Sequence, residues 1–262
     1  MRPRSVISLL VWDSPLYTRN LLKNLDWAVP GNSMHTIILD QGSEPETRDY
    51  LREYVPSRSN ISAILLDENI GYGAGHNRNY QTARDQGEFD YFITINNDVV
   101  FGEQLWADRL VDMMEANPRA AIGGPFGYRR DGDYLTPSTK EDMKSGNFLF
   151  VTGAICIIRA AAVEQAGLFD EAYSPAYWED YDMAMRYLHF GWEQIFIDIS
   201  AVHGYFGNDE KVSRKKKEAL LERHGNFEER NREIFNRRWI GIPPLSEREN
   251  PLSWSDALYR PK

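Results

Sequence analysis

The stretch that decides the fold reads ITINNDVVF, from Ile93 to Phe101. An apolar run typical of a buried strand stops at Asn96-Asn97-Asp98 and then resumes as Val-Val-Phe. A carboxylate flanked by amides at a strand end can hold a hard divalent cation through oxygen, with a substrate diphosphate supplying further ligands. The same three residues would equally make a turn that caps the next helix. Taken alone, the stretch leaves both interpretations open.

Around this stretch, apolar runs that fit buried strands alternate with segments that fit helices. Strands are expected at 6–11, 35–40, 61–66 and 91–95, and helices at 15–25, 44–54, in the second half of 67–87, and at 103–117. This order predicts an α/β fold with a mostly parallel central sheet and helices on both faces. Ligands of such sheets bind beyond the carboxyl ends of the strands. Asp40, Asp67 and residues 96–98 each follow a strand, so we expect them near one site.

The second half of the chain is less regular. Residues 124–147 are rich in Gly, Pro and charge and predict a long, mobile loop that acts as a lid. Further elements are expected as a strand at 148–158, helices at 159–166 and 179–190, and a strand at 192–199. Beyond His203 the composition changes to a charged helical segment and a Pro-rich tail. We therefore predict a catalytic domain over 1–205 and a helical, Pro-rich C-terminal extension over 206–262.

Composition narrows the class of protein. The net charge of -9 disfavours nucleic acid as a partner, because binding to it needs a basic surface. The sequence contains no run of about 18 apolar residues that would indicate a membrane span. The single cysteine, Cys156, excludes an intrachain disulfide and fits a reducing compartment, so a cytoplasmic location is expected. The basic run 214–217 fits a solvated helix face, a diphosphate contact, or a contact with an anionic lipid-linked acceptor at the inner face of the membrane.

Two further segments carry groups suited to chemistry. NIGYGAGHNRNY (69–80) has the spacing G-x-G-x-G rather than the dinucleotide-binding G-x-G-x-x-G, and it follows the third predicted strand, so it does not indicate an NAD site. It fits either a flexible helix-capping turn or a turn that brings Asn77 and Arg78 to a phosphate or base. In YWEDYDMAMRYLHFGW (177–192), three acids open a predicted helix, where the helix dipole favours them.

Those acids are Glu179, Asp180 and Asp182. Asp182 and Arg186 have the i,i+4 spacing of an ordinary surface pair. However, two aromatic residues directly before the acids are more typical of the wall of a site, and a carboxylate there can act as a general base. His203 follows another predicted strand, and a metal held by one aspartate and a diphosphate has room for an imidazole.

In this order, the motifs resemble those of family 2 glycosyltransferases of the GT-A fold, close to the bacterial rhamnosyltransferase-like branch. The resemblance runs from about Val6 to His203 and rests on LDQGS (39–43), NIGYGAGHNRNY (69–80), INNDVVF (95–101), TGAICIIRAAAVEQAGLFDE (152–171) and WEDYDMAMRYLHFGW (178–192). The last two motifs together are the most specific. Asn79 departs from the small residue that is usual in the second motif.

The resemblance implies an inverting transferase that moves a sugar from a nucleotide-diphosphate sugar to a hydroxyl acceptor, in bacterial surface polysaccharide or glycan assembly. It implies Mn²⁺ or Mg²⁺ as cofactor and a glycan or lipid-linked acceptor. The roles it implies are nucleotide contacts at Asp40, Asp67, Gly71, Arg78 and Asn96, metal ligands at Asp98 and His203, the catalytic base at Asp180, and acceptor contacts at Glu179 and Trp178.

Two other functions compete with this one. A sugar nucleotidyltransferase usually carries a Gly-rich basic loop after the first strand, where this chain reads VWDSPLY (11–17). A catalytically inactive nucleotide-sugar-binding module would not need Asp98, Asp180 and His203. Candidate associations also include the inner membrane face and a second copy of the chain, which the tail after Arg238 would contact.

Overall fold

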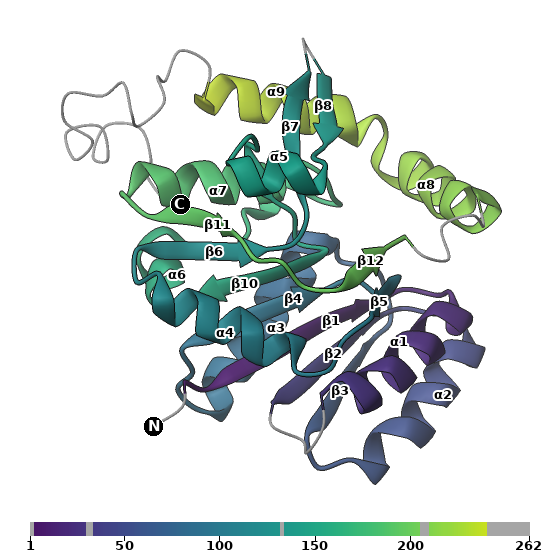
Figure 1. Cartoon of the computed structure of the whole chain (residues 1–262). Coiled ribbons are helices and arrows are strands. Elements are labelled where there is room, and N and C mark those ends of the chain that lie inside the picture. The colour runs from purple at the N-terminus through teal and green to yellow at the C-terminus, as the bar shows by residue number, and fades with distance from the viewer. Residues whose placement is uncertain (1–2, 30–33, 132–133, 205–209, 240–262) are drawn as a thin grey trace.

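The computed structural model describes residues 3–29, 34–131, 134–204 and 210–239, the side chains of 210–216 excepted. Its centre is a seven-stranded sheet in the order β11-β6-β10-β4-β1-β2-β3 (Figure 1). β10 runs antiparallel to its neighbours β4 and β6, and all other neighbours are parallel. The predicted α/β fold is therefore confirmed. The strands are β1 (Ser5–Val11), β2 (His35–Gln41), β3 (Ile61–Leu66), β4 (Tyr91–Ile95), β6 (Ala120–Gly124), β10 (Ile155–Arg159) and β11 (Glu193–Phe196).

The first four predicted strands are confirmed to within one residue at each end. The central strands β1, β2 and β4 are buried on both faces, which explains their nearly continuous apolar runs. The register pairs Val11 with Asp40 and Asp40 with Leu65, so the first three strands end at one edge of the sheet. Leu9 pairs with Ile95, which brings Asn96 to the same edge.

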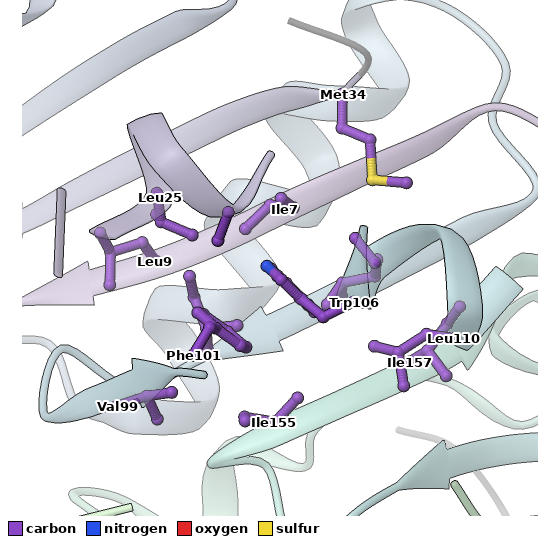
Figure 2. Packing of buried hydrophobic residues seen from close by; sticks show 14 of the residues in the cluster. Ile7, Leu9, Leu25, Met34, Val99, Phe101, Trp106, Leu110, Ile155 and Ile157 are labelled. Atoms are coloured by element: carbon purple, nitrogen blue, oxygen red, sulfur yellow. The ribbon is translucent and has the colours of Figure 1, made fainter. Parts of the chain in front are cut away.

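Helices cover both faces of the sheet, as predicted. One face carries α1 (Pro15–Ala28), α2 (Pro45–Tyr54) and α4 (Trp106–Ala116), and the other carries α3 (Tyr72–Gln86), α6 (Ala160–Ala166) and α7 (Glu179–His189). On the first face Phe101 stacks on Trp106, with ring centroids 3.9 Å apart, among the aliphatic side chains of β1 and β10 (Figure 2). The predicted helix 103–117 begins only at Trp106, because Leu105 has a left-handed backbone (φ 60°).

The prediction of a long, mobile loop at 124–147 is wrong. The segment forms a hairpin of β7 (Gly127–Asp131) and β8 (Tyr134–Pro137) and a helix, α5 (Lys140–Ser145). β7 also pairs with β9 (Phe150–Val151), so 148–158 splits between a three-stranded sheet and the main sheet. α5 begins at a capping box, in which Thr139 Oγ1 accepts from the Asp142 amide (3.1 Å) and Asp142 Oδ2 accepts from the Thr139 amide (2.9 Å).

The described part of 206–239 forms two helices, α8 (Glu210–His224) and α9 (Phe227–Trp239). α9 buries Phe227, Asn231, Phe235 and Trp239, and Phe235 and Trp239 belong to the hydrophobic cluster that contains the buried face of α7. It therefore packs as part of the core behind α7. Within the described residues, none of the helices has the length and apolar character to cross a bilayer. The tail 240–262 and the side chains of Arg214, Lys215 and Lys216 lie outside the described residues.

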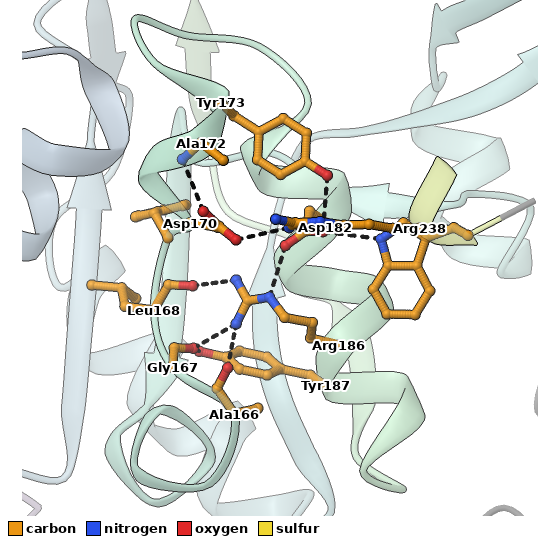
Figure 3. A network of polar contacts seen from close by, with 12 residues as sticks. Ala166, Gly167, Leu168, Asp170, Ala172, Tyr173, Asp182, Arg186, Tyr187 and Arg238 are labelled. Carbon is orange, nitrogen blue, oxygen red and sulfur yellow. Dashed lines mark hydrogen bonds and ion pairs between the residues drawn. The ribbon is translucent and has the colours of Figure 1, made fainter. Parts of the chain in front are cut away.

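A buried ionic network fixes α9 to α7 (Figure 3). Asp182 is fully buried and accepts hydrogen bonds from Arg186 Nε (2.7 Å), Trp239 Nε1 (2.9 Å), the Tyr173 hydroxyl (3.0 Å) and Arg238 (3.2 Å). Arg186 also donates to the carbonyls of residues 166–168. The expectation that Asp182 and Arg186 form a surface pair is therefore wrong. The two residues form a core pair that has enough hydrogen bonds to be tolerated in the interior.

Candidate active site

The polar stretch 96–98 lies between β4 and a short strand, β5 (Val99–Phe101), which pairs with β12 (Ala201–His203). The register places His203 opposite Val99, next to the stretch. His203 Nε2 lies 3.4 Å from Asp98 Oδ1 and 3.2 Å from Asn96 Nδ2. Both the imidazole and the carboxylate are partly exposed (40% and 28%). The structure therefore joins the two predicted metal ligands, which are 105 positions apart in the sequence.

A carboxylate and an imidazole suit Mn²⁺ or Mg²⁺ as two ligands of a larger set. In the described part of the chain, no cluster of three or more His, Cys, Asp or Glu side chains could hold a metal ion. A cation between Asp98 and His203 would therefore take its remaining ligands from water or from the phosphates of a substrate. The donor set fits a metal that binds together with a diphosphate.

The second group of the site opens α7. Asp180 Oδ2 accepts a hydrogen bond from the Gly153 amide (3.0 Å), while its Oδ1 is buried and has no hydrogen-bond partner among the described residues. Burial raises the pKa of Asp180 to about 6, against the opposing effects of the Gly153 amide and of His203. Glu179 is also buried, and burial together with the neighbouring Asp180 charge raises its pKa well above the usual value. Burial thus favours the protonated form of both carboxyl groups.

Tyr72 is a member of the site that the sequence alone did not indicate. Its hydroxyl is buried with no hydrogen-bond partner in the described chain, and burial together with the Asp180 and Glu179 charges raises its pKa, which keeps it protonated. A methyl group on Gly153 would lie 2.1 Å from this hydroxyl and 2.9 Å from Asp180 Oδ1, so all three groups meet at one point. An aromatic residue between two glycines at a predicted helix start was the available signal.

Three neighbouring cavities converge on this point. The largest of the three, about 560 Å³, lies between His203 and the start of α7, and its walls include Asn96, Tyr72, Glu179, Asp180 and His203. A volume of that size is typical of a small-molecule site. The second, about 210 Å³, shares Tyr72 and Asn96 and extends along the strand ends to Leu10, Trp12, Gln41 and Asn69. The third, about 360 Å³, shares Glu179 and Asp180 and is lined by Trp178 and four other aromatic side chains.

The predicted nucleotide contacts are distributed unevenly around these cavities. Asp40 is fully buried at the end of β2, and burial raises its pKa. Arg48 lies 3.7 Å from both Asp40 and the exposed Asp67 and so links them. Neither carboxylate is among the residues that line the second cavity, although Gln41 and Asn69 beside them are.

Gly71 and Arg78 lie farther along the chain. Gly71 is the N-cap of α3 with φ 97°, and a Cβ there would lie 3.0 Å from the Pro175 carbonyl oxygen. Arg78 is exposed on α3 and is not among the residues that line the three cavities. The structure thus gathers Asn96, Asp98, Trp178, Glu179, Asp180 and His203 at one site and does not bring Arg78 to it.

The arrangement of this mostly parallel sheet and the helices on its two faces is the GT-A fold. The chain belongs to glycosyl transferase family 2: the sequence model of that family matches residues 17–167. The expected family and fold are both confirmed. No curated protein matches this sequence.

Solved structures with the same fold include a mannosyltransferase, PcManGT from Pyrobaculum calidifontis, in complex with GDP-Man and Mn²⁺. It is 14% identical with a TM-score of 0.57, and the match covers 75% of this chain and 55% of that one. GalNAc-T7 with UDP, GalNAc and Mn²⁺ is 11% identical with a TM-score of 0.60, and the match covers 74% of this chain and 42% of that one. The match thus spans about half the length of these proteins, and at such identities it shows the fold alone.

Proposed function

We propose that this chain is an inverting, metal-dependent glycosyltransferase that moves a sugar from a nucleoside-diphosphate sugar to a hydroxyl group of a glycan or lipid-linked acceptor, in the assembly of a bacterial surface polysaccharide. The observation that carries this proposal is the placement of one ionisable, incompletely paired carboxylate, Asp180, on the cavity that His203 also lines, with Asp98 3.4 Å from that imidazole. The donors in the two structures of the same fold, GDP-Man and UDP with GalNAc, support this donor class.

The residues take distinct parts in the reaction. Asp98 and His203 would hold Mn²⁺ or Mg²⁺, which stabilises the diphosphate leaving group. Asp180 takes the proton from the acceptor hydroxyl as that oxygen attacks the anomeric carbon from the face opposite the diphosphate. A single displacement of this kind needs one positioned carboxylate and inverts the anomeric configuration. Glu179 contacts the acceptor.

The acceptor would lie in the third cavity. Trp178 and Glu179 line it, and Asp180 lines both this cavity and the main one. Aromatic rings suit the apolar faces of a sugar, which agrees with a glycan acceptor. The nucleotide would lie along the strand ends in the second cavity, beside Gln41, with Asp40, Asp67, Gly71 and Asn96 close to it. We place the protein in the cytoplasm, where nucleotide sugars are available, and at the inner membrane face when the acceptor is lipid-linked.

The test combines donor turnover with two variants. The protein is incubated with Mn²⁺ and a panel of UDP-, dTDP- and GDP-sugars, and released nucleoside diphosphate is measured with and without acceptor saccharides. Turnover that releases nucleoside diphosphate supports transfer. Pyrophosphate-dependent exchange would indicate a nucleotidyltransferase, and binding without any turnover would indicate an inactive binding module. NMR of the anomeric proton in the first product decides between inversion and retention.

Asp180→Asn should abolish transfer and leave the Kd for the nucleotide within about twofold, because the amide keeps the shape and loses the base. Equal losses of transfer and binding would refute its role as base. Asp98→Ala should remove the Mn²⁺ dependence of donor affinity. Donor affinity that still depends on Mn²⁺ in this variant would exclude Asp98 as a ligand.

A further inference from the structure

The segment that precedes the candidate catalytic acids has an unusual backbone. Tyr177 and Trp178 adopt φ values of 73° and 78°, in the left-handed region that L residues with large side chains avoid. They are followed at once by Glu179 and Asp180, the first two residues of α7. The conformation at 177–178 therefore sets the direction in which both carboxyl groups leave the helix start. Something in the fold must hold this conformation in place.

One side chain from α9 does so. Asn231 is fully buried, and its Nδ2 donates to the carbonyls of Tyr173 (2.6 Å), Ala176 (2.9 Å) and Tyr177 (3.2 Å). An amide nitrogen has two hydrogens and is surrounded here by three acceptors, so only a donor fits this position. The neighbouring Arg230 donates to the Asn231 Oδ1 (3.2 Å) and to the Ser174 carbonyl.

The segment is also fixed on its other side. The Tyr72 amide at the start of α3 donates to the Pro175 carbonyl (2.7 Å). The Tyr177 ring stacks on Phe227 at the start of α9, with centroids 5.9 Å apart and planes at 10°. Residues 173–178 are thus held between the helix that borders the second cavity and the C-terminal helix. The contacts from α9 come from residues beyond the part of the chain that the family sequence model matches, 17–167.

We propose that Asn231 is a positioning residue for the transfer reaction: from α9 it holds the left-handed turn at Tyr177 and Trp178 and so aims Asp180 and Glu179 into the reaction cavity. The proposal rests on the proposed function for the role of Asp180. It adds that the C-terminal helix completes the active site. The predicted metal ligands, Asp98 just before β5 and His203 on β12, do not depend on this contact, so loss of Asn231 should separate catalysis from nucleotide binding.

The experiment compares Asn231→Asp with Asn236→Asp. The first places a carboxylate oxygen against three carbonyl oxygens at unchanged size. The second makes the same change on the same helix, at a half-buried residue that donates to none of these carbonyls. We expect kcat for transfer to fall at least tenfold in Asn231→Asp with the Kd for the nucleoside diphosphate and Mn²⁺ within twofold, and no such fall in Asn236→Asp. Unchanged kcat in Asn231→Asp, or equal losses in kcat and nucleotide affinity, would overturn the proposal.

A second measurement keeps the proposal testable if Asn231→Asp folds poorly. With glycine at 177 one of the two left-handed residues no longer carries a steric cost, so Asn231→Asp should lower kcat by a smaller factor in the Tyr177→Gly background than in the wild type. Equal factors in the two backgrounds would show that Asn231 does not act through the turn. Hydrogen–deuterium exchange of the wild-type protein and Asn231→Asp should show faster exchange confined to about 173–182.

The two proposals fail in different ways. A wild-type protein that turns over no nucleotide sugar would refute the proposed function, while local exchange at 173–182 would still show whether Asn231 holds the turn. A wild-type protein that transfers sugar normally, with unchanged exchange in Asn231→Asp, would refute the positioning role and leave the proposed function intact.

Discussion

Gly153→Ala tests the centre of the candidate site with a single methyl group. Gly153 is buried between β9 and β10, its amide donates to Asp180 Oδ2 (3.0 Å), and its carbonyl accepts from Thr94 Oγ1 (2.9 Å). The backbone therefore cannot shift without losing both hydrogen bonds. A Cβ at this position would lie 2.1 Å from the Tyr72 hydroxyl and 2.9 Å from Asp180 Oδ1. The side chains that line the cavity must move instead.

The size of the effect follows from these distances. To restore a contact of 3.0 Å from 2.1 Å, the Tyr72 hydroxyl must move by 0.9 Å, while its ring is packed against His76 (4.5 Å) and Phe169 (5.5 Å). Asp180 Oδ1 must also move slightly. A displacement of about 1 Å in a catalytic group costs about 100-fold in rate. We therefore expect kcat to fall about 100-fold, or about 2.7 kcal/mol in activation free energy.

The assay is steady-state transfer at saturating donor and Mn²⁺, with the nucleotide Kd measured in parallel and expected within about twofold of wild type. Tyr72→Phe removes the atom at 2.1 Å and leaves the ring carbon at 3.1 Å. Gly153→Ala should therefore cost less in a Tyr72→Phe background. Gly123→Ala is the matched control, because its Cβ would lie 2.5 Å from Ile197 Cδ1, away from the cavities. It should lower stability without lowering kcat. A Gly153→Ala enzyme with more than a third of wild-type kcat would refute the reasoning.

Three further results are expected. Activity should fall below about pH 6 as Asp180 becomes protonated. Because folding raises the pKa of Asp180 from 3.8, ionisation of this group at high pH destabilises the folded protein. Asp180→Asn should therefore raise the Tm at pH 8 and not at pH 4, and a lower Tm at pH 8 would contradict this. Asp182→Ala should lower the free energy of unfolding in urea by about 3–5 kcal/mol because it leaves a buried guanidinium with fewer partners, whereas Glu46→Ala at an exposed pair should cost less than about 1 kcal/mol. His203→Gln should weaken Mn²⁺ binding in calorimetry by at least about tenfold, and unchanged Mn²⁺ affinity would exclude the imidazole as a ligand.

The first half of the fold could be predicted from the sequence because its signals are local. A parallel strand buried on both faces gives a continuous apolar run, and β4 was located to the residue for that reason. The rule that ligands bind at carboxyl strand ends then placed residues 96–98 and His203 near one another. It needed no knowledge of side-chain directions, and it placed Asp98 and His203 correctly at one edge.

The features that the sequence did not predict depend on contacts between segments that are distant in the sequence. Asp182 and Arg186 have the spacing of a surface pair, and what buries them is α9, whose Arg238 and Trp239 contact the same carboxylate. The hairpin of β7 and β8 has little apolar alternation, because neither strand buries one face along its length. Its polar composition therefore resembled a loop. Tyr72 looked like part of a flexible glycine turn, and only the tertiary fold turns its hydroxyl toward Asp180.

Asp180 and Asp182 lie in the first turn of the same helix but in two different environments. They are two residues apart on α7, so they leave the helix in different directions. Asp182 points into the core, where Arg186, Arg238, Tyr173 and Trp239 supply its hydrogen bonds. Asp180 points to the cavity, where one backbone amide satisfies one oxygen and leaves the other incompletely paired. Because α9 supplies partners to Asp182 and holds the turn before Asp180, the same helix stabilises the core carboxylate and positions the cavity carboxylate that accepts a proton in the proposed reaction.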